Sequence, residues 1–170
     1  MKKLLAIFCV LAVFASTAVA APKKSKVKGS KIGVSMPTKD LQRWNQDGAN
    51  MKAQLEAAGY KVDLQYAAND IPTQVSQIEN MITGNCKVLV IAAIDGSALK
   101  NPLEQAKKKG IKVIAYDRLI MNTDAVSYYA TFDNYKVGTI QGEYLVDKLG
   151  LKTRSSSDPV YMELFTGDPG

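Results

Sequence analysis

Two pairs of neighbouring residues, Arg43-Trp44 and Asp117-Arg118, carry the side chains in this sequence that are best suited to hold a sugar. Guanidinium and carboxylate groups form charge-assisted, often bidentate hydrogen bonds with hydroxyl groups, and an indole ring covers the flatter C–H face of a sugar. Each pair also has a plainer explanation. A single Trp is commonly a core residue, and an adjacent Asp and Arg can be an ordinary surface pair. The residue types alone leave both interpretations open.

Other site chemistries lack the residues that they require. The sequence has no His, and Cys86 is its one cysteine outside the N-terminal apolar run, so the usual zinc ligand sets and the Ser-His-Asp relay are missing. The loop at 33–40 has a single glycine, whereas a dinucleotide or phosphate loop needs several. Asp117 and Asp133 could form the carboxylate pair of a glycosidase, but acids on α/β scaffolds often pair with bases without catalysis. We therefore expect no enzyme activity, no metal and no cofactor.

Residues 1–20 have the three parts of a secretory signal peptide, namely two lysines, an apolar run over 4–13 and small residues at 18–20. A retained membrane anchor is the alternative, because the apolar stretch is at the short limit for spanning a bilayer. We predict cleavage after residue 20 and export to the periplasm, which leaves a basic leader at 21–30. Loss of the two lysines lowers the net charge from +6 to +4, a modest surplus that predicts no nucleic-acid partner.

Apolar runs and helical stripes alternate along the rest of the chain. Runs bounded by turn residues predict strands, and apolar stripes between cap and stop residues predict helices, the second of them capped by Asn69 or Asp70. The predicted strands are 31–36, 61–66, 88–94, 112–116, 128–132 and 160–165. The predicted helices are 41–58, 70–84, 97–110 and 135–148, the last with Val137, Ile140, Tyr144 and Leu145 facing inward.

This alternation predicts an α/β fold with a doubly wound parallel sheet and helices on both faces. The run at 88–94 is apolar throughout, which favours a strand covered on both sides. In such sheets ligands bind beyond the carboxyl ends of the strands. That rule selects five loops, at 37–44, 95–97, 117–118, 133–134 and 166–170.

Several blocks of the sequence, in one order, resemble the periplasmic sugar-binding proteins of ABC transporters. The resemblance is to the xylose-binding and multiple-sugar-binding members of the ribose/galactose-binding group, with the type 1 periplasmic binding protein fold. It implies a two-lobed receptor that captures a monosaccharide between its lobes and passes it to an ABC permease. In some relatives the receptor also contacts a chemoreceptor or a sensor kinase. The blocks are 42–44, 74–82, 88–91, 110–118 and 132–138.

The same resemblance implies roles for five residues. Arg43, Asp117 and Arg118 would hydrogen-bond sugar hydroxyls, Trp44 would stack on the ring, and Asn134 would be a hinge residue or a minor contact. Residues 31–132 would form the N-terminal lobe, and 133–170 would begin a second lobe. Because nothing follows the last predicted strand, we interpret the chain as truncated, with a genuine C-terminus as the alternative. The Arg-Trp pair favours xylose or a related aldopyranose.

Two other classes of protein remain open at this stage. Lac-type transcription regulators share the fold, but they carry a helix-turn-helix where this chain has its signal peptide. An exported binding or sensor protein for a non-sugar small molecule, or for chemotactic signalling, is the stronger alternative. The Arg43-Trp44 and Asp117-Arg118 pairs favour a neutral polyol over such a ligand without excluding it.

Overall fold

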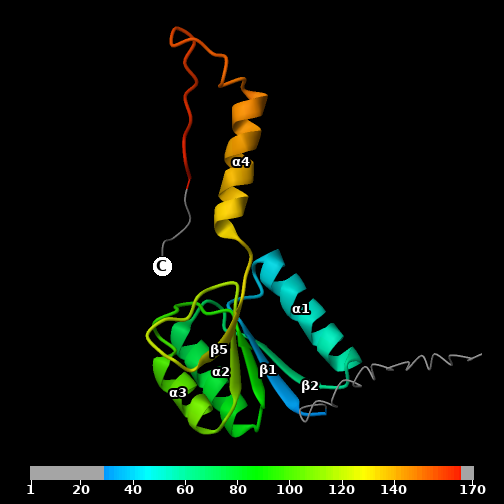
Figure 1. Ribbon diagram of the computed structural model, residues 1–170. Coiled ribbons are helices and arrows are strands. Elements are labelled where there is room, and N and C mark those ends of the chain that lie inside the picture. Colours follow the sequence, from blue (N-terminus) through cyan, green and yellow to red (C-terminus); the bar gives the residue numbers. More distant parts are fainter. Residues whose placement is uncertain (1–28, 166–170) are drawn as a thin grey trace, which may run out of the picture.

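A five-stranded parallel sheet lies at the centre of the structure, a computed structural model that describes residues 29–165 (Figure 1). The strands lie in the order β2-β1-β3-β4-β5, and helices alternate with most of them along the chain. This is the predicted doubly wound α/β architecture. The strands are β1 (Lys31–Met36), β2 (Lys61–Tyr66), β3 (Val88–Ile91), β4 (Lys112–Tyr116) and β5 (Val126–Ala130). The helices are α1 (Gln42–Ala57), α2 (Ile71–Thr83), α3 (Lys100–Lys108) and α4 (Asn134–Lys148).

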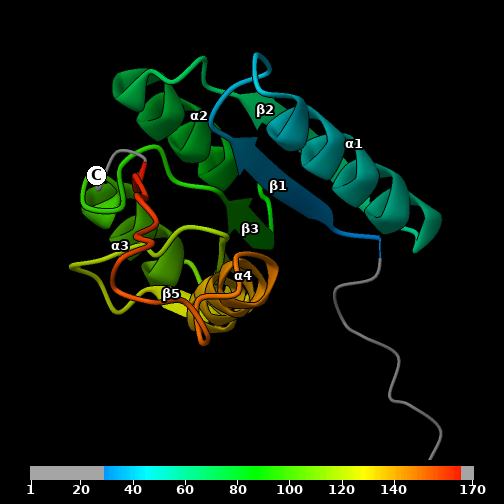
Figure 2. The same ribbon diagram turned by 90° about the horizontal axis from the view of Figure 1, so that it is seen from above.

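Alternating side chains of the strands build a separate hydrophobic core on each face of the sheet. In β3, Leu89 and Ile91 belong to the core beneath α2 and α3, whereas Val88 and Val90 belong to the core beneath α1. Figure 2 shows this arrangement, with α2 and α3 on one side of the sheet and α1 on the other. Both faces of β3 are therefore covered, as its continuous apolar sequence predicts.

Three predicted elements have boundaries that differ from the observed ones by two or three residues. β3 ends at Ile91 rather than at 94, because the backbone N–H of Ile94 donates to the side chain of Gln74 and not to a neighbouring strand. α3 begins at Lys100 rather than at 97, because the carboxylate of Asp95 accepts from Ser97 N at 2.7 Å and holds a turn there. β5 lies two residues earlier than predicted, and its pairing with β4 shifts register between Val126 and Tyr128.

The start of α2 is confirmed at the predicted cap. The carboxylate of Asp70 accepts a hydrogen bond from Thr73 N at 2.8 Å, and Pro72 occupies the first turn, where its missing N–H leaves no bond unmade. The hydrogen bond from Thr73 lowers the pKa of Asp70 below the ordinary value of an aspartate.

Asp70→Ala is expected to lower the urea midpoint of unfolding at neutral pH, with a difference from wild type that shrinks below about pH 3.9, the ordinary pKa of Asp. A carboxyl whose pKa is lowered in the folded state stabilises the fold above its ordinary pKa. That contribution is lost as the pH falls through the folded-state value. Urea unfolding across this pH range measures the effect, and Asp70→Asn, which caps a helix without titrating, is the control. A difference in urea midpoint between wild type and Asp70→Ala that stayed constant below about pH 3.9 would contradict the prediction.

The chain beyond β5 leaves the sheet, and two predictions for it are wrong. α4 has no buried residue, so the stripe of Val137, Ile140, Tyr144 and Leu145 does not face inward. Figure 1 shows α4 projecting away from the sheet. Residues 160–165 form no strand, and Tyr161, Leu164 and Phe165 are almost fully exposed. The physical reason is the same in both cases: within residues 29–165 no strand pairs with 160–165, and no strand or helix buries a residue of α4.

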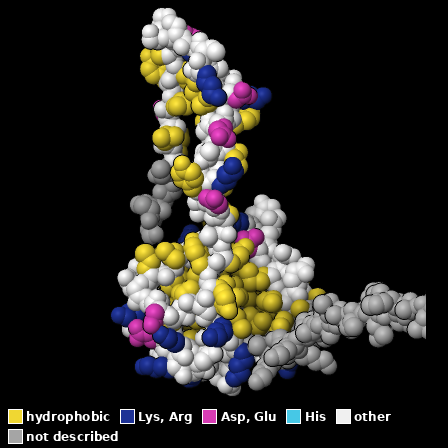
Figure 3. All heavy atoms as spheres, viewed as in Figure 1, with side chains coloured by type: hydrophobic (Ala, Val, Ile, Leu, Met, Phe, Trp, Pro, Cys, Tyr) yellow, Lys and Arg dark blue, Asp and Glu magenta, His cyan; other side chains and the backbone are white. Residues whose placement is uncertain are grey.

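One face of the sheet is only partly covered. α1 contacts β1 and β2 and covers Val90 of β3, whereas apolar side chains of β4 and β5 on this face are more open to solvent (Figure 3). Tyr128 of β5, which is paired with Ile114 of β4, lies on this face and is exposed. No helix within residues 29–165 is long and apolar enough to cross a membrane.

Candidate functional site

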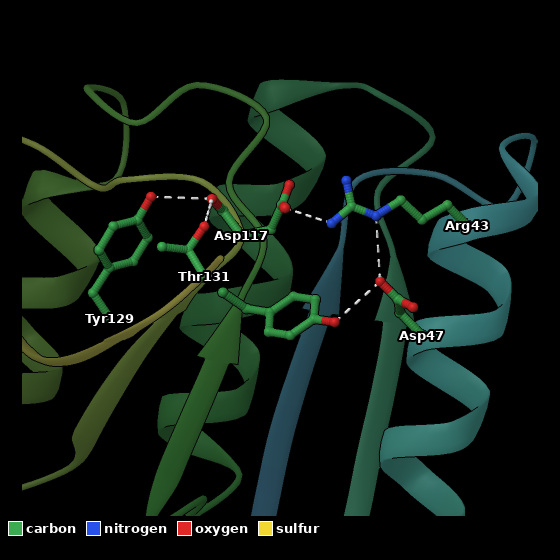
Figure 4. Close-up of polar contacts among 6 residues, drawn as sticks. Arg43, Asp47, Asp117, Tyr129 and Thr131 are labelled. Atoms are coloured by element: carbon green, nitrogen blue, oxygen red, sulfur yellow. Dashed lines mark hydrogen bonds and ion pairs between the residues drawn. The ribbon is translucent and has the colours of Figure 1, made fainter. Parts of the chain in front are cut away.

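The carboxyl ends of the strands bring together residues that are far apart in the sequence. Arg43 lies in the first turn of α1, Asp117 directly follows β4, and a guanidinium nitrogen of Arg43 donates to the Asp117 carboxylate across 74 residues (Figure 4). The side chain of Asp117 is 12% exposed and that of Arg43 is 49% exposed, so the pair lies at a boundary between protein and solvent. The predicted convergence of these two loops is confirmed.

Arg43 has a second acidic partner on its own helix. Its Nε lies 3.5 Å from Oδ2 of Asp47, one helical turn later, and the same oxygen accepts a hydrogen bond from the Tyr116 hydroxyl at 3.0 Å. The hydrogen bond to Asp117 raises the pKa of Arg43, and burial together with the hydrogen bond to Asp47 raises the pKa of Tyr116. Tyr116 therefore stays a neutral donor, and Asp47 and Asp117 hold the guanidinium from two sides.

The backbone of Asp117 adopts the left-handed conformation, with φ of +62°. This region is strained for most residues and is tolerated best by Gly, Asn and Asp. Contacts from the β5 side hold it there: Asp117 N donates to Ala130 O at 2.8 Å, and its carbonyl accepts from the Tyr129 hydroxyl at 3.1 Å and the Thr131 hydroxyl at 3.2 Å. Figure 4 shows Tyr129 and Thr131 converging on this residue. The side-chain carboxylate of Asp117 therefore projects from a backbone turn that these hydrogen bonds hold in place.

Trp44 packs into the core instead of standing open at the site. It is 3% exposed and belongs to the apolar cluster beneath α1. The guanidinium carbons of Arg43 and Arg118 lie 4.6 Å and 5.5 Å from its ring centroid, within the range of cation–π attraction. The indole therefore supports both cationic side chains, while most of its surface is covered.

Arg118 is anchored to the neighbouring strand end. One guanidinium nitrogen donates to the carbonyl oxygens of Ala93 at 3.0 Å and Ile94 at 3.3 Å. These residues follow β3, so Arg118 joins the ends of β3 and β4. Its side chain is exposed, and its remaining donors are available at this edge.

A cavity of about 260 Å³ opens beside the ion pair, just under the range of about 300–1,000 Å³ that is common for small-molecule sites. The ring of Phe132 is 50% exposed and lies 6.0 Å from the guanidinium carbon of Arg43. The cavity is lined by Arg43, Tyr116, Asp117, Ala130, Thr131 and Phe132. A larger hollow of about 620 Å³ lies beside β2 and contains none of the predicted site residues. We place the candidate site at the smaller cavity because charge and an open aromatic ring meet there.

Sequence reasoning missed three residues of this arrangement. Asp47 carried a usable signal, since it lies four residues after Arg43 on the same helix and such pairs face each other. Phe132 was assigned to a strand, although it directly precedes the selected loop at 133–134. Nothing in the sequence marks Tyr116 as a partner of Asp47, because that contact joins residues 69 positions apart.

The structure does not bring Asn134 to the cluster by any contact. Asn134 is the first residue of α4 and is exposed, and its side chain forms no hydrogen bond with another residue of 29–165. The fifth selected loop, 166–170, lies outside the described residues. Within the part of the chain that the structure describes, no group of three or more His, Cys, Asp or Glu residues could hold a metal ion.

Known proteins share this architecture. Residues 32–170 match the family model of a periplasmic binding protein domain. The multiple sugar-binding periplasmic protein SbpA of Azospirillum brasilense is 58% identical over 138 residues, which are 81% of this chain and 38% of SbpA. A D-xylose-binding periplasmic protein of Haemophilus influenzae is 44% identical over 143 residues, 84% of this chain and 41% of that protein.

A similar solved structure is an ABC transporter solute-binding protein from Clostridium phytofermentans with bound β-D-glucose. It is 69% identical, with a TM-score of 0.77, over 82% of this chain and 43% of that chain. The chain thus spans about two fifths of the length of these relatives. The family match covers the parallel sheet and the polar cluster at its carboxyl edge, and on this basis the chain belongs to the periplasmic binding protein family.

Proposed function

We propose that the protein captures a monosaccharide, xylose or a related aldopyranose, in the periplasm and delivers it to an ABC permease. The observation that carries the proposal is the Arg43–Asp117 ion pair beside a cavity with an exposed aromatic ring. An ion pair offers a neutral polyol strong donors and strong acceptors together, while its charges balance. The names of the similar proteins, which bind xylose, glucose or several sugars, support the same ligand class.

In this proposal Arg43 and Asp117 bind sugar hydroxyls directly, and Arg118 supplies further donors from the end of β4. Because the indole of Trp44 is almost fully covered, its role is to support the guanidinium groups of Arg43 and Arg118. The stacking contact passes mainly to Phe132, whose ring is accessible. Asn134 contributes from the start of the second lobe. None of these residues has a catalytic role.

The proposal has a cellular setting. Residues 1–20 are removed on export, 31–132 form the N-terminal lobe, and 133–170 begin the second lobe, which closes over the sugar. The closed, liganded form is the one that the permease binds. A chemoreceptor or sensor kinase would bind the same closed, liganded form.

Titration calorimetry and thermal unfolding of the exported protein are expected to single out one or two sugars from a panel of D-xylose, D-glucose, D-galactose, L-arabinose and D-ribose. A ligand that binds only the folded state stabilises it by about 2.7 kcal/mol at about 100 times its Kd. For a domain of this size that raises Tm by roughly 5–10 °C. Mannitol, an open-chain polyol with no ring face, is the control. A panel that leaves Tm unchanged, or mannitol matching the best sugar, would contradict the proposal.

A further inference from the structure

A row of lysines occupies the amino ends of the parallel strands. At the opposite end of the sheet lie Arg43, Asp117 and Arg118, which the proposed function assigns to sugar binding and which we call the sugar cluster. Lys31 and Lys61 are paired across β1 and β2, Lys87 donates its backbone N–H to Lys31 O, and Lys112 donates to Lys87 O. Neighbouring strands lie about 4.8 Å apart, so the four lysines form a row about 14 Å long. The parallel register therefore places one lysine at the start of each of four adjacent strands.

The end of α3 broadens this row, because α3 ends just before Lys112. Lysines in a last helical turn complement the helix dipole, which accounts for Lys107 and Lys108 but not for the row across the strands. All of these lysines are exposed except Lys31, which is half-buried. We define the lysine edge as Lys31, Lys61, Lys87, Lys107, Lys108, Lys109 and Lys112.

Acidic residues compensate only part of this charge. Asp63 pairs with Lys31 at 2.7 Å and Asp124 with Lys107 at 2.6 Å, while Glu56, at the end of α1, pairs with Lys52 at 3.8 Å. The other five members of the lysine edge form no ion pair with any residue of 29–165. Figure 3 shows the cationic side chains along the lower border of the molecule. In the sequence, four more lysines at 23, 24, 26 and 28 directly precede β1.

We propose that the lysine edge binds the exported protein to an anionic phospholipid bilayer. The lysines are spread along a line and do not converge on a point, which suits an extended surface of headgroups better than a discrete anion. Lysine is a compact charge on a flexible stem, suited to non-specific attraction by a negative surface rather than to bidentate recognition. The sheet would stand upright on the bilayer, with the carboxyl edge and its sugar cluster facing away and open. The inference does not depend on which ligand that cluster binds.

Vesicle co-sedimentation of the exported protein tests this proposal. We expect binding to vesicles in which about a third of the lipid is phosphatidylglycerol, no binding to pure phosphatidylcholine, and loss of binding when salt rises to about 0.5 M. The triple variant Lys61→Gln, Lys87→Gln, Lys112→Gln should lower the partition coefficient on the order of a hundredfold. The triple variant Lys136→Gln, Lys148→Gln, Lys152→Gln removes the same charge from exposed positions on and after α4 and should bind nearly as well as wild type.

Both triple variants change exposed side chains only, so their thermal unfolding by circular dichroism should match wild type. Equal partitioning of the two variants would overturn the proposal, since net charge rather than the lysine edge would then govern binding. Binding that survives high salt would also overturn it. Binding to soluble heparin without binding to the phosphatidylglycerol vesicles would assign the edge to an anionic polymer and overturn the bilayer proposal.

Discussion

Asp117→Asn is expected to weaken monosaccharide binding about 30-fold while the unliganded protein stays folded. The variant loses the charge that pairs with Arg43 and that strengthens acceptance from sugar hydroxyls, and hydrogen bonds to a charged group are worth about 1.5–3 kcal/mol. Asn tolerates the left-handed backbone at this position, so the change removes the charge without straining the turn. Calorimetric titration with the sugar identified from the panel measures the effect.

Asp124→Asn is the matched control for this experiment. It makes the same chemical change in an exposed ion pair, with Lys107, at the opposite end of the sheet, and it should leave sugar affinity unchanged. The thermal midpoint of unliganded Asp124→Asn should lie close to wild type, because an exposed ion pair contributes little to stability. Unliganded Asp117→Asn should also stay folded, because Arg43 keeps its ion pair with Asp47 and Asn tolerates the backbone conformation at 117. Wild-type affinity in Asp117→Asn would remove this carboxylate from the site.

Gln74→Leu is expected to lower the free energy of unfolding by about 3 kcal/mol, the largest stability effect that we anticipate for a single polar side chain. Gln74 is 1% exposed on α2, and its amide makes three hydrogen bonds. Its nitrogen donates to the Ser35 hydroxyl at 3.1 Å and to Ala92 O at 2.9 Å, and its oxygen accepts from Ile94 N at 2.9 Å. Leu fills a similar volume but leaves these buried groups without their partner.

Urea unfolding of Gln74→Leu, compared with Gln105→Leu, measures this contribution. Gln105 is exposed on α3, so its replacement should change the free energy of unfolding by less than about 0.5 kcal/mol. Gln74→Leu should also weaken sugar binding. Gln74 holds the segment that follows β3, and the carbonyl oxygens of this segment accept the hydrogen bonds of Arg118. A urea midpoint equal to that of wild type would show that the network contributes nothing net.

Local patterns predicted most of the fold because they report local burial. The apolar run at β3 predicted a strand covered on both faces, and Asp70 followed by Pro72 predicted the start of α2. The same reasoning failed for α4. An apolar stripe shows that a helix has a face to bury, but it does not say whether the covering surface lies within the described part of the chain.

For the site, the sequence predicted that the loops of Arg43 and Asp117 meet, but not how the side chains lie in them. The meeting of Arg43 and Asp117 follows from the rule that parallel strands end at one edge. The burial of Trp44, the left-handed backbone of Asp117 and the accessibility of Phe132 depend on contacts between distant segments. Such contacts leave no periodic signal in the residues nearby.

The 74-residue separation of Arg43 and Asp117 has a consequence for how the proposed sugar site forms during folding. A partly folded chain that has assembled only β1, α1 and β2 possesses the cation without its acidic partner. Contacts between such distant residues form late in folding, because closing the long loop between them costs conformational entropy before the contact can stabilise the chain. A ligand that needs both side chains cannot bind early folding intermediates, so it does not accelerate folding. It slows unfolding of the native state instead. Sugar in the medium should therefore protect molecules that have already matured, without hastening the maturation of new ones.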